Sequence, residues 1–135
     1  MPRICLDTNV IVSALISQGT SRQVLDLVRG GVVTLVLSPF ILEETADVLR
    51  AKMDWDEGRI QNALEMIKAL SSLVSPVERL SVVKDDTQDN RIVECAFFGR
   101  AAYLVSGDKH ILSLGGYRGI RFLSPRDLLE ALRDE

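Results

Sequence analysis

Short apolar runs alternate along this chain with longer segments in which apolar residues recur every three or four positions. The runs are rich in aliphatic and β-branched side chains, which is typical of buried strands, and they cover residues 3–6, 32–37, 101–106 and 120–123. The segments with helical spacing predict helices over residues 9–16, 20–29, 39–49, 56–73, 90–98, 111–112 and 125–132. Residues 74–83, interrupted by a proline, fit a short edge strand and an extended loop equally well.

Turn and capping residues mark where several of these elements begin and end. Ser38–Pro39 and Ser124–Pro125 each combine an N-cap residue with a first-turn proline. Gly30–Gly31 and Gly99 end two of the helices. Strands that alternate with helices imply parallel neighbours joined by right-handed crossovers. We therefore expect an α/β sandwich with a mostly parallel sheet, built as one domain over residues 1–135.

The composition fits a compact domain, and the lack of long apolar segments indicates the cellular compartment. A chain of 135 residues, 47% hydrophobic and 26% charged, is long enough for one hydrophobic core. No apolar run approaches the roughly 20 residues that span a bilayer, and the N-terminus lacks the apolar segment of a signal peptide. We therefore expect a cytoplasmic protein with no membrane partner. Cys5 and Cys95 stand alone in apolar surroundings and are expected to be reduced core thiols.

The net charge of −3 gives no overall positive field for a nucleic-acid partner. An RNA substrate would need local arginines and bound cations. Lys109 and Arg91 could contact phosphate, although surface salt bridges explain them as well. The single histidine, His110, is expected on an exposed turn and is not counted as catalytic. The aromatic residues expected to fill the core, not to stack on bases, are Phe97, Phe98, Tyr103 and Phe122.

Four acidic residues stand where functional groups gather in such folds. Asp7 ends the first strand, Asp108 follows the strand over residues 101–106, Asp89 lies near a helix N-terminus, and Glu44 lies early in the helix after the second strand. The carboxyl ends of parallel strands meet at one edge of a sheet, so these side chains can lie together. Clustered carboxylates repel one another and require a neutralising cation. Oxygen ligands select Mg²⁺ or Mn²⁺, and the matching chemistry is phosphodiester hydrolysis.

Five segments, in order along the chain, resemble the PIN-domain family and more closely its VapC-like toxins, ribonucleases of prokaryotic toxin–antitoxin systems. They are Leu6–Val10, Ser38–Leu49, Asp86–Ala96, Tyr103–His110 and Gly119–Leu129. The resemblance implies a three-layer α/β/α fold, endonucleolytic cleavage of RNA, dependence on Mg²⁺ or Mn²⁺, and frequent homodimerisation. For the toxin branch it also implies neutralisation by a small antitoxin protein.

The resemblance also assigns site residues. The family's acidic quartet corresponds to Asp7, Glu44, Asp89 and Asp108, and its neighbouring polar positions correspond to Thr8 or Asn9 and to Ser106. In this hypothesis Asp7, Asp89 and Asp108 ligate the cation directly or through water. Glu44 completes the shell or positions the attacking water.

Two of these assignments have close competitors. Glu43 precedes Glu44, which is preferred because it stands four residues before the Val48–Leu49 pair, as the family acid does. Asp85 and Asp86 compete with Asp89, which is preferred because it directly precedes the expected helix start.

Other functions account for fewer of these residues. A phosphatase that forms an aspartyl phosphate would need a second acid two residues after Asp7, where Asn9 stands. A receiver-like domain would need an aspartate at the end of a middle strand, where Leu37–Ser38 stands. A housekeeping RNA-processing PIN nuclease without an antitoxin, and a non-catalytic domain that binds ligands in an acidic pocket, stay open as alternatives. In a purely structural reading, Asp7 would end a strand and Asp89 would cap a helix.

Overall fold

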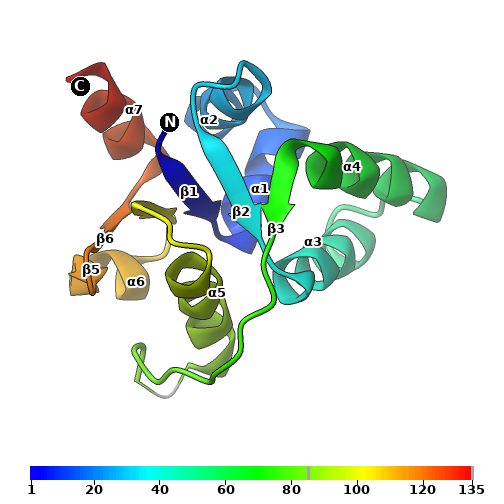
Figure 1. The fold of residues 1–135 in the computed structure, drawn as a ribbon. Coiled ribbons are helices and arrows are strands. Elements are labelled where there is room, and N and C mark those ends of the chain that lie inside the picture. The colour runs from blue at the N-terminus through cyan, green and yellow to red at the C-terminus, as the bar shows by residue number, and fades with distance from the viewer. Residues whose placement is uncertain (85, 135) are drawn as a thin grey trace.

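A computed structural model of the chain describes residues 1–84 and 86–134. In these residues strands and helices alternate along much of the chain (Figure 1). The strands are β1 (Arg3–Leu6), β2 (Thr34–Leu37), β3 (Ser71–Leu73), β4 (Tyr103–Val105), β5 (Gly116–Tyr117) and β6 (Ile120–Leu123). The helices are α1 (Thr8–Ile16), α2 (Thr20–Arg29), α3 (Pro39–Ala51), α4 (Glu57–Leu70), α5 (Thr87–Phe98), α6 (Lys109–Leu114) and α7 (Pro125–Arg133).

The strands form one six-stranded sheet in the order β3-β2-β1-β4-β6-β5. All neighbouring strands are parallel except β5, which pairs antiparallel with β6. The chain builds outward from β1 through β2 to β3, then crosses to the other side of β1 to form β4. The order therefore reverses between β1 and β4, and in parallel sheets ligands bind beyond the carboxyl ends of the strands at such a reversal.

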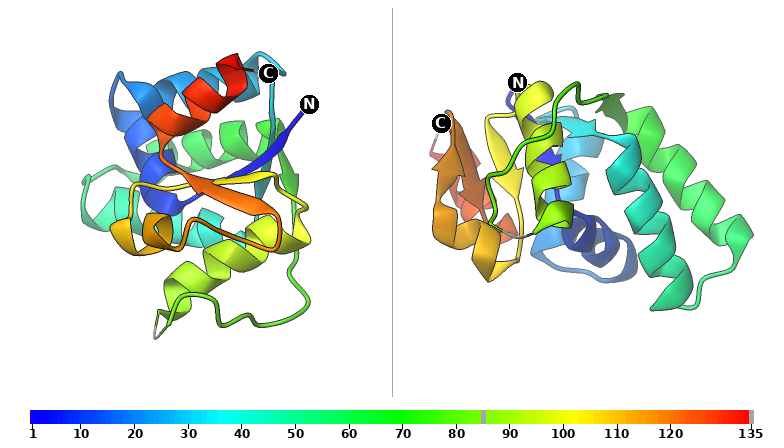
Figure 2. Two further views of the ribbon diagram at one scale, coloured as in Figure 1. Left: turned by 90° about the vertical axis from the view of Figure 1, so that its left-hand side faces the viewer. Right: turned by 90° about the horizontal axis from the view of Figure 1, so that it is seen from below.

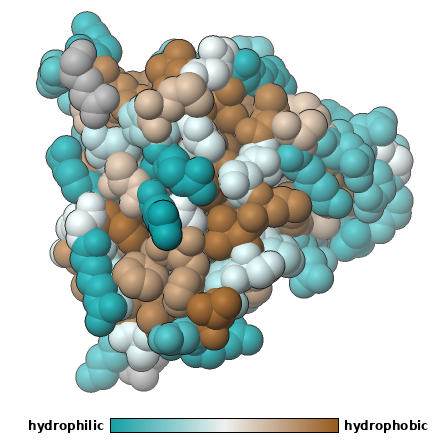
Figure 3. Space-filling model, in the orientation of Figure 1, coloured by the Kyte–Doolittle hydropathy of each residue, from teal (hydrophilic) through white to brown (hydrophobic). Residues whose placement is uncertain are grey.

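Helices cover both faces of the sheet. Figure 2 shows α5 and α6 on one face and α1, α2 and α7 on the other, and α5 packs against β1, β2 and β4. Helices α3 and α4 pack on each other and project to one side (Figure 1). Hydrophilic side chains cover the outer end of this pair, whereas hydrophobic ones gather nearer the middle of the same view (Figure 3). The expected three-layer α/β/α sandwich is confirmed.

The buried core lies where the sequence pattern places it. The central strands contribute fully buried aliphatic side chains, because each is covered on both faces: Ile4, Leu6, Leu35, Leu37 and Leu104. Burying each such side chain stabilises the fold by about 1.5–3 kcal/mol. Cys5 and Cys95 are free thiols buried between β1 and α5, as expected. No helix in the described residues is long and apolar enough to cross a membrane.

The predicted helix over residues 56–73 is wrong in its last three residues. Helix α4 ends at Leu70, and Ser71, Ser72 and Leu73 pair in register with Leu35, Val36 and Leu37 of β2. The open edge of β2 supplies hydrogen-bond partners that a further helical turn would leave unused. The edge strand therefore precedes residues 74–83, which form no regular element.

Three smaller differences also have local causes. Strand β2 begins two residues later than predicted, after a turn in which Gly31 has a φ of +74°. The two-residue strand β5 was not predicted. Helix α5 begins at Thr87 instead of residue 90, because the Asp86 side chain caps it by accepting a hydrogen bond from the Asp89 backbone N–H at 2.9 Å.

We predict that Leu104→Ala destabilises the chain by about 2–5 kcal/mol, because it opens a cavity in the middle of the sheet. Leu104 is 0% exposed in the central strand β4, whereas Leu114 at the end of α6 is 45% exposed. Leu114→Ala is the matched control, and we expect a change within about 0.5 kcal/mol. Urea unfolding measures both. Equal losses in the two variants would contradict the assignment of the core.

Candidate functional site

The site is built around Asp7, the first residue after β1. Its backbone N–H donates to the Val105 carbonyl at 3.0 Å, so it lies beside the end of β4. Asp7 is 4% exposed as a residue, and its carboxylate accepts hydrogen bonds from the Val10 backbone N–H at 2.9 Å and from the Ser106 hydroxyl. The Ser106 oxygen also accepts from the Asp108 backbone N–H at 2.9 Å. Ser106 therefore orients both Asp7 and the start of the segment that carries Asp108.

Acidic side chains from the beginnings of three helices (α1, α5 and α6) and from one face of α3 line a pocket of about 440 Å³ at this edge of the sheet. The lining residues are Asp7, Thr8, Asn9, Glu44, Asp47, Val48, Ala51, Lys52, Asp86, Gln88, Asp89, Ile92 and Asp108. This set holds six carboxylates and one lysine. The structure therefore brings together all four predicted acids, with Thr8 and Asn9 beside them, and places the buried Ser106 hydroxyl directly behind Asp7.

The two adjacent glutamates of α3 have different surroundings. Glu44 is half-buried, lines the pocket and accepts a hydrogen bond from the buried Thr8 hydroxyl. Glu43 is exposed and does not line the pocket. The geometry therefore supports the preference for Glu44, because only its carboxylate is held in place by a partner at the site.

At the start of α5, the capping role belongs to Asp86 and not to Asp89. Asp89 is thereby left without the structural role that a helix cap would give it, and its buried Oδ2 atom has no hydrogen-bond partner. Asp86 lines the same pocket, so both acids belong to it. Asp85, the other competitor, lies outside the described residues.

Burial and the charges of neighbouring carboxylates shift the pKa values of Asp7 and Asp89 upward. Burial raises the pKa of Asp7, against the hydrogen bonds from Ser106 and Val10, which lower it; the charges of Asp108 and Glu44 raise it further. Burial, followed by the charges of Asp86 and Asp108, raises the pKa of Asp89 to about 7. Bringing a cation into the pocket would reverse these effects, because it favours the ionised carboxylates.

The donor set fits a hard divalent cation. It consists of carboxylate oxygens, including an unpartnered buried one on Asp89. No three His, Cys, Asp or Glu side chains among the described residues are close enough to hold one ion by themselves. Mg²⁺ fits this spacing because it keeps several waters and is bound directly by only one or two carboxylates. Asp7, Asp89 and Asp108 would hold it, directly or through water.

Two acids of the pocket are not among the four predicted ones: Asp86, which was considered and passed over, and Asp47, which was not considered. Asp86 was set aside because α5 was expected to begin later, although the spacing Asp86-Thr87-Gln88-Asp89 itself resembles a capping pattern. Asp47 lies one turn after Glu44 on the same helix, and this spacing could have identified it. Asp47 also pairs with Arg50 at 3.1 Å.

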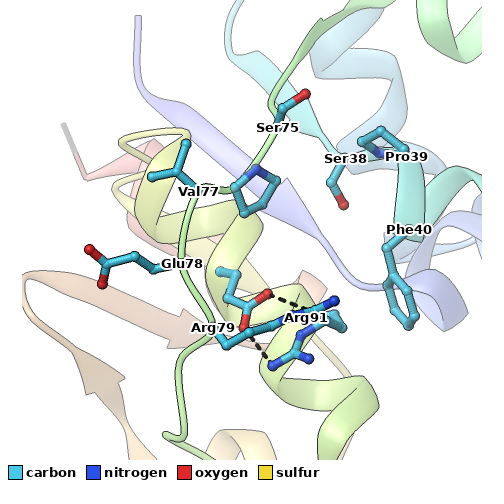
Figure 4. Close-up of a pocket in the computed structure, with 10 residues that line it drawn as sticks. Ser38, Pro39, Phe40, Ser75, Val77, Glu78, Arg79 and Arg91 are labelled. Carbon is cyan, nitrogen blue, oxygen red and sulfur yellow. Dashed lines mark ion pairs between the residues drawn. The ribbon is translucent and has the colours of Figure 1, made fainter.

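The remaining candidates lie outside the acidic pocket. His110 and Lys109 are exposed, as expected for His110. Arg91 pairs with the buried carboxylate of Glu94 at 2.6 Å, in a second pocket of about 340 Å³ between the start of α3 and residues 75–79 (Figure 4). Glu94 also accepts from the Leu80 backbone N–H at 2.7 Å. Arg91 and Glu94 therefore fasten the segment before α5, and a salt bridge accounts for Arg91.

Comparison with known proteins identifies the fold and the family. The family model of the PIN domain matches residues 3–110. VapBC2 from Rickettsia felis, in a crystal structure with a DNA fragment from its promoter, is similar with a TM-score of 0.64 and 15% identity, over 89% of this chain and 96% of that chain. VapBC-1 from nontypeable Haemophilus influenzae is similar with a TM-score of 0.64 and 14% identity, over 92% and 98%. Among curated proteins, none matches this chain.

We predict that Asp89→Asn stabilises the cation-free chain at pH 8, and that this gain disappears below about pH 4. The pKa of Asp89 in the folded chain is about 7, above the value of about 3.9 for an unfolded Asp. The folded chain therefore binds more protons between these pH values, so the carboxyl lowers stability as the pH rises through this window. The amide cannot ionise and escapes this loss.

Urea unfolding in EDTA at pH 8 and pH 4 measures this effect. Asp26→Asn is the control, because Asp26 is exposed on α2 and has only a long ion pair of 3.7 Å with Arg29. A gain from Asp89→Asn that is the same at both pH values, or a loss at pH 8, would contradict the electrostatic description of the pocket.

Proposed function

This chain belongs to the PIN-domain family, and we propose that it is a metal-dependent endoribonuclease whose active site is the acidic pocket. The observation that supports this best is that six carboxylates and one lysine line the same pocket. Among the six, Asp7 is buried, and a buried oxygen of Asp89 has no hydrogen-bond partner. Such a set is costly for a protein that binds nothing there. A divalent cation bound for nuclease chemistry would remove this cost, because it favours the ionised carboxylates.

Each residue of the pocket has a role in this proposal. Asp7, held by Ser106 and the Val10 N–H, presents a fixed carboxylate to the cation, with Asp89 and Asp108 on the neighbouring elements. Glu44, held by Thr8, orients the attacking water and accepts its proton. A bound Mg²⁺ or Mn²⁺ would lower the pKa of that water and stabilise the charge that develops on the scissile phosphate.

The biological role that we infer is that of a toxin neutralised by a small antitoxin. The resemblance of the sequence to VapC-like toxins and the shared fold with the VapBC structures support this role. Homodimerisation, which the same resemblance implies, stays a prediction. A housekeeping PIN nuclease without an antitoxin would have the same pocket. A short gene for a DNA-binding partner next to this one would favour the toxin.

A binding domain without catalysis is the main alternative class, because an acidic pocket can hold a cation or a basic ligand without cutting RNA. The phosphatase alternative loses support, because Asn9 is exposed at the position where a second acid would be needed. The nuclease and the non-catalytic binding domain differ in one measurable property. Only a nuclease produces RNA fragments that depend on the acids and on the cation together.

We predict that the purified chain cleaves a labelled RNA pool with Mg²⁺ or Mn²⁺ but not with EDTA, and that Asp7→Asn lowers the rate by about 100-fold or more. Glu44→Gln should lower the rate by about 10- to 100-fold, because the amide cannot accept a proton from water. Gel separation of the fragments measures the rates.

Glu43→Gln is the matched control for Glu44→Gln, because it makes the same change on the adjacent, exposed residue. We expect its rate to stay within about twofold of the unmodified chain. Full activity of Asp7→Asn would contradict the assigned site. Binding of RNA without fragments under either cation would favour the non-catalytic alternative.

A further inference from the structure

The last third of the chain carries cations that have no acidic partners. Residues 95–126 contain five lysines or arginines (Arg100, Lys109, Arg118, Arg121 and Arg126) but a single acid, Asp108. All ion pairs found between described residues lie within residues 26–94. A chain with a net charge of −3 therefore has a locally basic region.

Two of these cations lie close to Phe97, at the end of the sheet opposite the acidic pocket. Arg100 follows the C-terminal end of α5, and Arg118 lies in the turn between β5 and β6. Both are exposed and have a positive φ, 56° and 44° respectively. This backbone conformation is unfavourable for residues with a Cβ atom. The acids of α7 lie nearer to Arg121, which shares a pocket with Asp127 and Glu130, so the inference rests on Arg100 and Arg118.

Two aromatic rings lie beside the guanidinium group of Arg118. Its guanidinium carbon is 5.6 Å from the centre of the Phe97 ring and 5.2 Å from that of Tyr117. Phe97 packs edge-to-face on Phe98 at 5.0 Å and on Tyr117 at 5.9 Å. Tyr103 and Phe122 are buried in the core as expected, but Phe97, Phe98 and Tyr117 are only partly buried. Part of this aromatic group is therefore available to a ligand.

We infer that this aromatic–arginine surface, formed by Phe97, Phe98, Arg100, Tyr117 and Arg118, binds a single-stranded stretch of the RNA substrate outside the acidic pocket. The inference rests on the proposed nuclease function and adds to it a second contact with the substrate, at a surface separate from the acidic pocket. Arginines beside partly exposed aromatic rings bind phosphate and stack on bases, which is how proteins hold single strands without reading their sequence.

Helix α5 connects this surface to the pocket. Asp89 lies in its first turn and Phe97 near its end, so the two are separated by about 12 Å along the helix axis at about 1.5 Å per residue. About four stacked nucleotides, at roughly 3.4 Å each, cover this distance. An RNA strand bound at both sites would be cut in the acidic pocket, while the aromatic–arginine surface holds nucleotides about four positions away.

The test uses the full chain in EDTA, where no cutting occurs, and a fluorescein-labelled single-stranded 12-nucleotide oligouridylate. We expect the double variant Arg100→Ala/Arg118→Ala to bind it at least about tenfold more weakly. The plot of log binding constant against log salt concentration has a negative slope, and we expect that slope to become about 1.4 less steep, because two phosphate contacts of about 0.7 each are lost. Tyr117→Leu should weaken binding about fivefold without changing the slope, because it removes stacking and no charge.

The matched control is Arg126→Ala/Arg133→Ala, which removes two exposed charges from α7 on the other face of the sheet. We expect its affinity to stay within about twofold, and melting curves of all variants to coincide. Equal weakening in both double variants would overturn the inference, because it would show only a general effect of charge. Tighter binding of polyglutamate than of RNA would also overturn it and point to an acidic polypeptide.

Cleavage with Mg²⁺ separates this inference from the proposed function. If both hold, Arg100→Ala/Arg118→Ala raises KM about tenfold and leaves kcat unchanged. If the unmodified chain binds the oligonucleotide through these arginines but never cuts RNA, the surface stands and the nuclease function fails. If RNA is cut with unchanged KM and unchanged affinity in the double variant, the nuclease stands and the surface is overturned.

Discussion

The fold depends on one constraint, which is the repulsion between acidic side chains that lie together where the parallel strands end. Asp7 is nearly buried, Asp89 has an oxygen without a partner, and the lining includes six acids against one lysine. Without a bound cation, the pKa values of Asp7 and Asp89 are raised, and their ionised forms lower the stability of the fold. The scaffold nevertheless keeps them together, which is the usual sign of a site whose stability is given up for function.

The rest of the fold positions this repulsive set. Strands β1 and β4 bring Asp7 and Ser106 side by side, and one hydroxyl then fixes both Asp7 and the segment that leads to Asp108. Helix α5 carries Asp89, and its own buried Asn90 accepts from the Val82 and Val83 backbone N–H groups at 2.8 and 2.7 Å. Through these bonds the segment before α5 is fastened to the helix. The sheet therefore positions Asp7 and Asp108, and helix α5 positions Asp89.

The α/β sandwich could be predicted from the sequence, because buried parallel strands have continuous apolar runs. Asp7 and Asp108 were candidates because they follow strands, whereas Glu44 and Asp89 were chosen over their acidic neighbours through the family resemblance. Ser71–Leu73 could not be predicted as a strand, because their local pattern continues a helix and only the distant edge of β2 makes them a strand. Asp86 was passed over and Asp47 was not considered, because which residues line the pocket depends on where a helix starts and how it is rotated. The PIN family match and the shared fold confirm the resemblance, while the role of each acid stays a proposal.

The central claim is that Asp7, Asp89 and Asp108 hold one divalent cation, directly or through water, with the carboxylate of Glu44 beside it. The most direct test is a Mn²⁺ titration of the full chain, followed by NMR of the side-chain carboxyl carbons, because the paramagnetic ion broadens only signals close to it. The account predicts that substoichiometric Mn²⁺ broadens these four signals together and leaves Glu43, the exposed neighbour of Glu44, sharp. Broadening that is absent from the four, or spread evenly over exposed carboxylates, would contradict it.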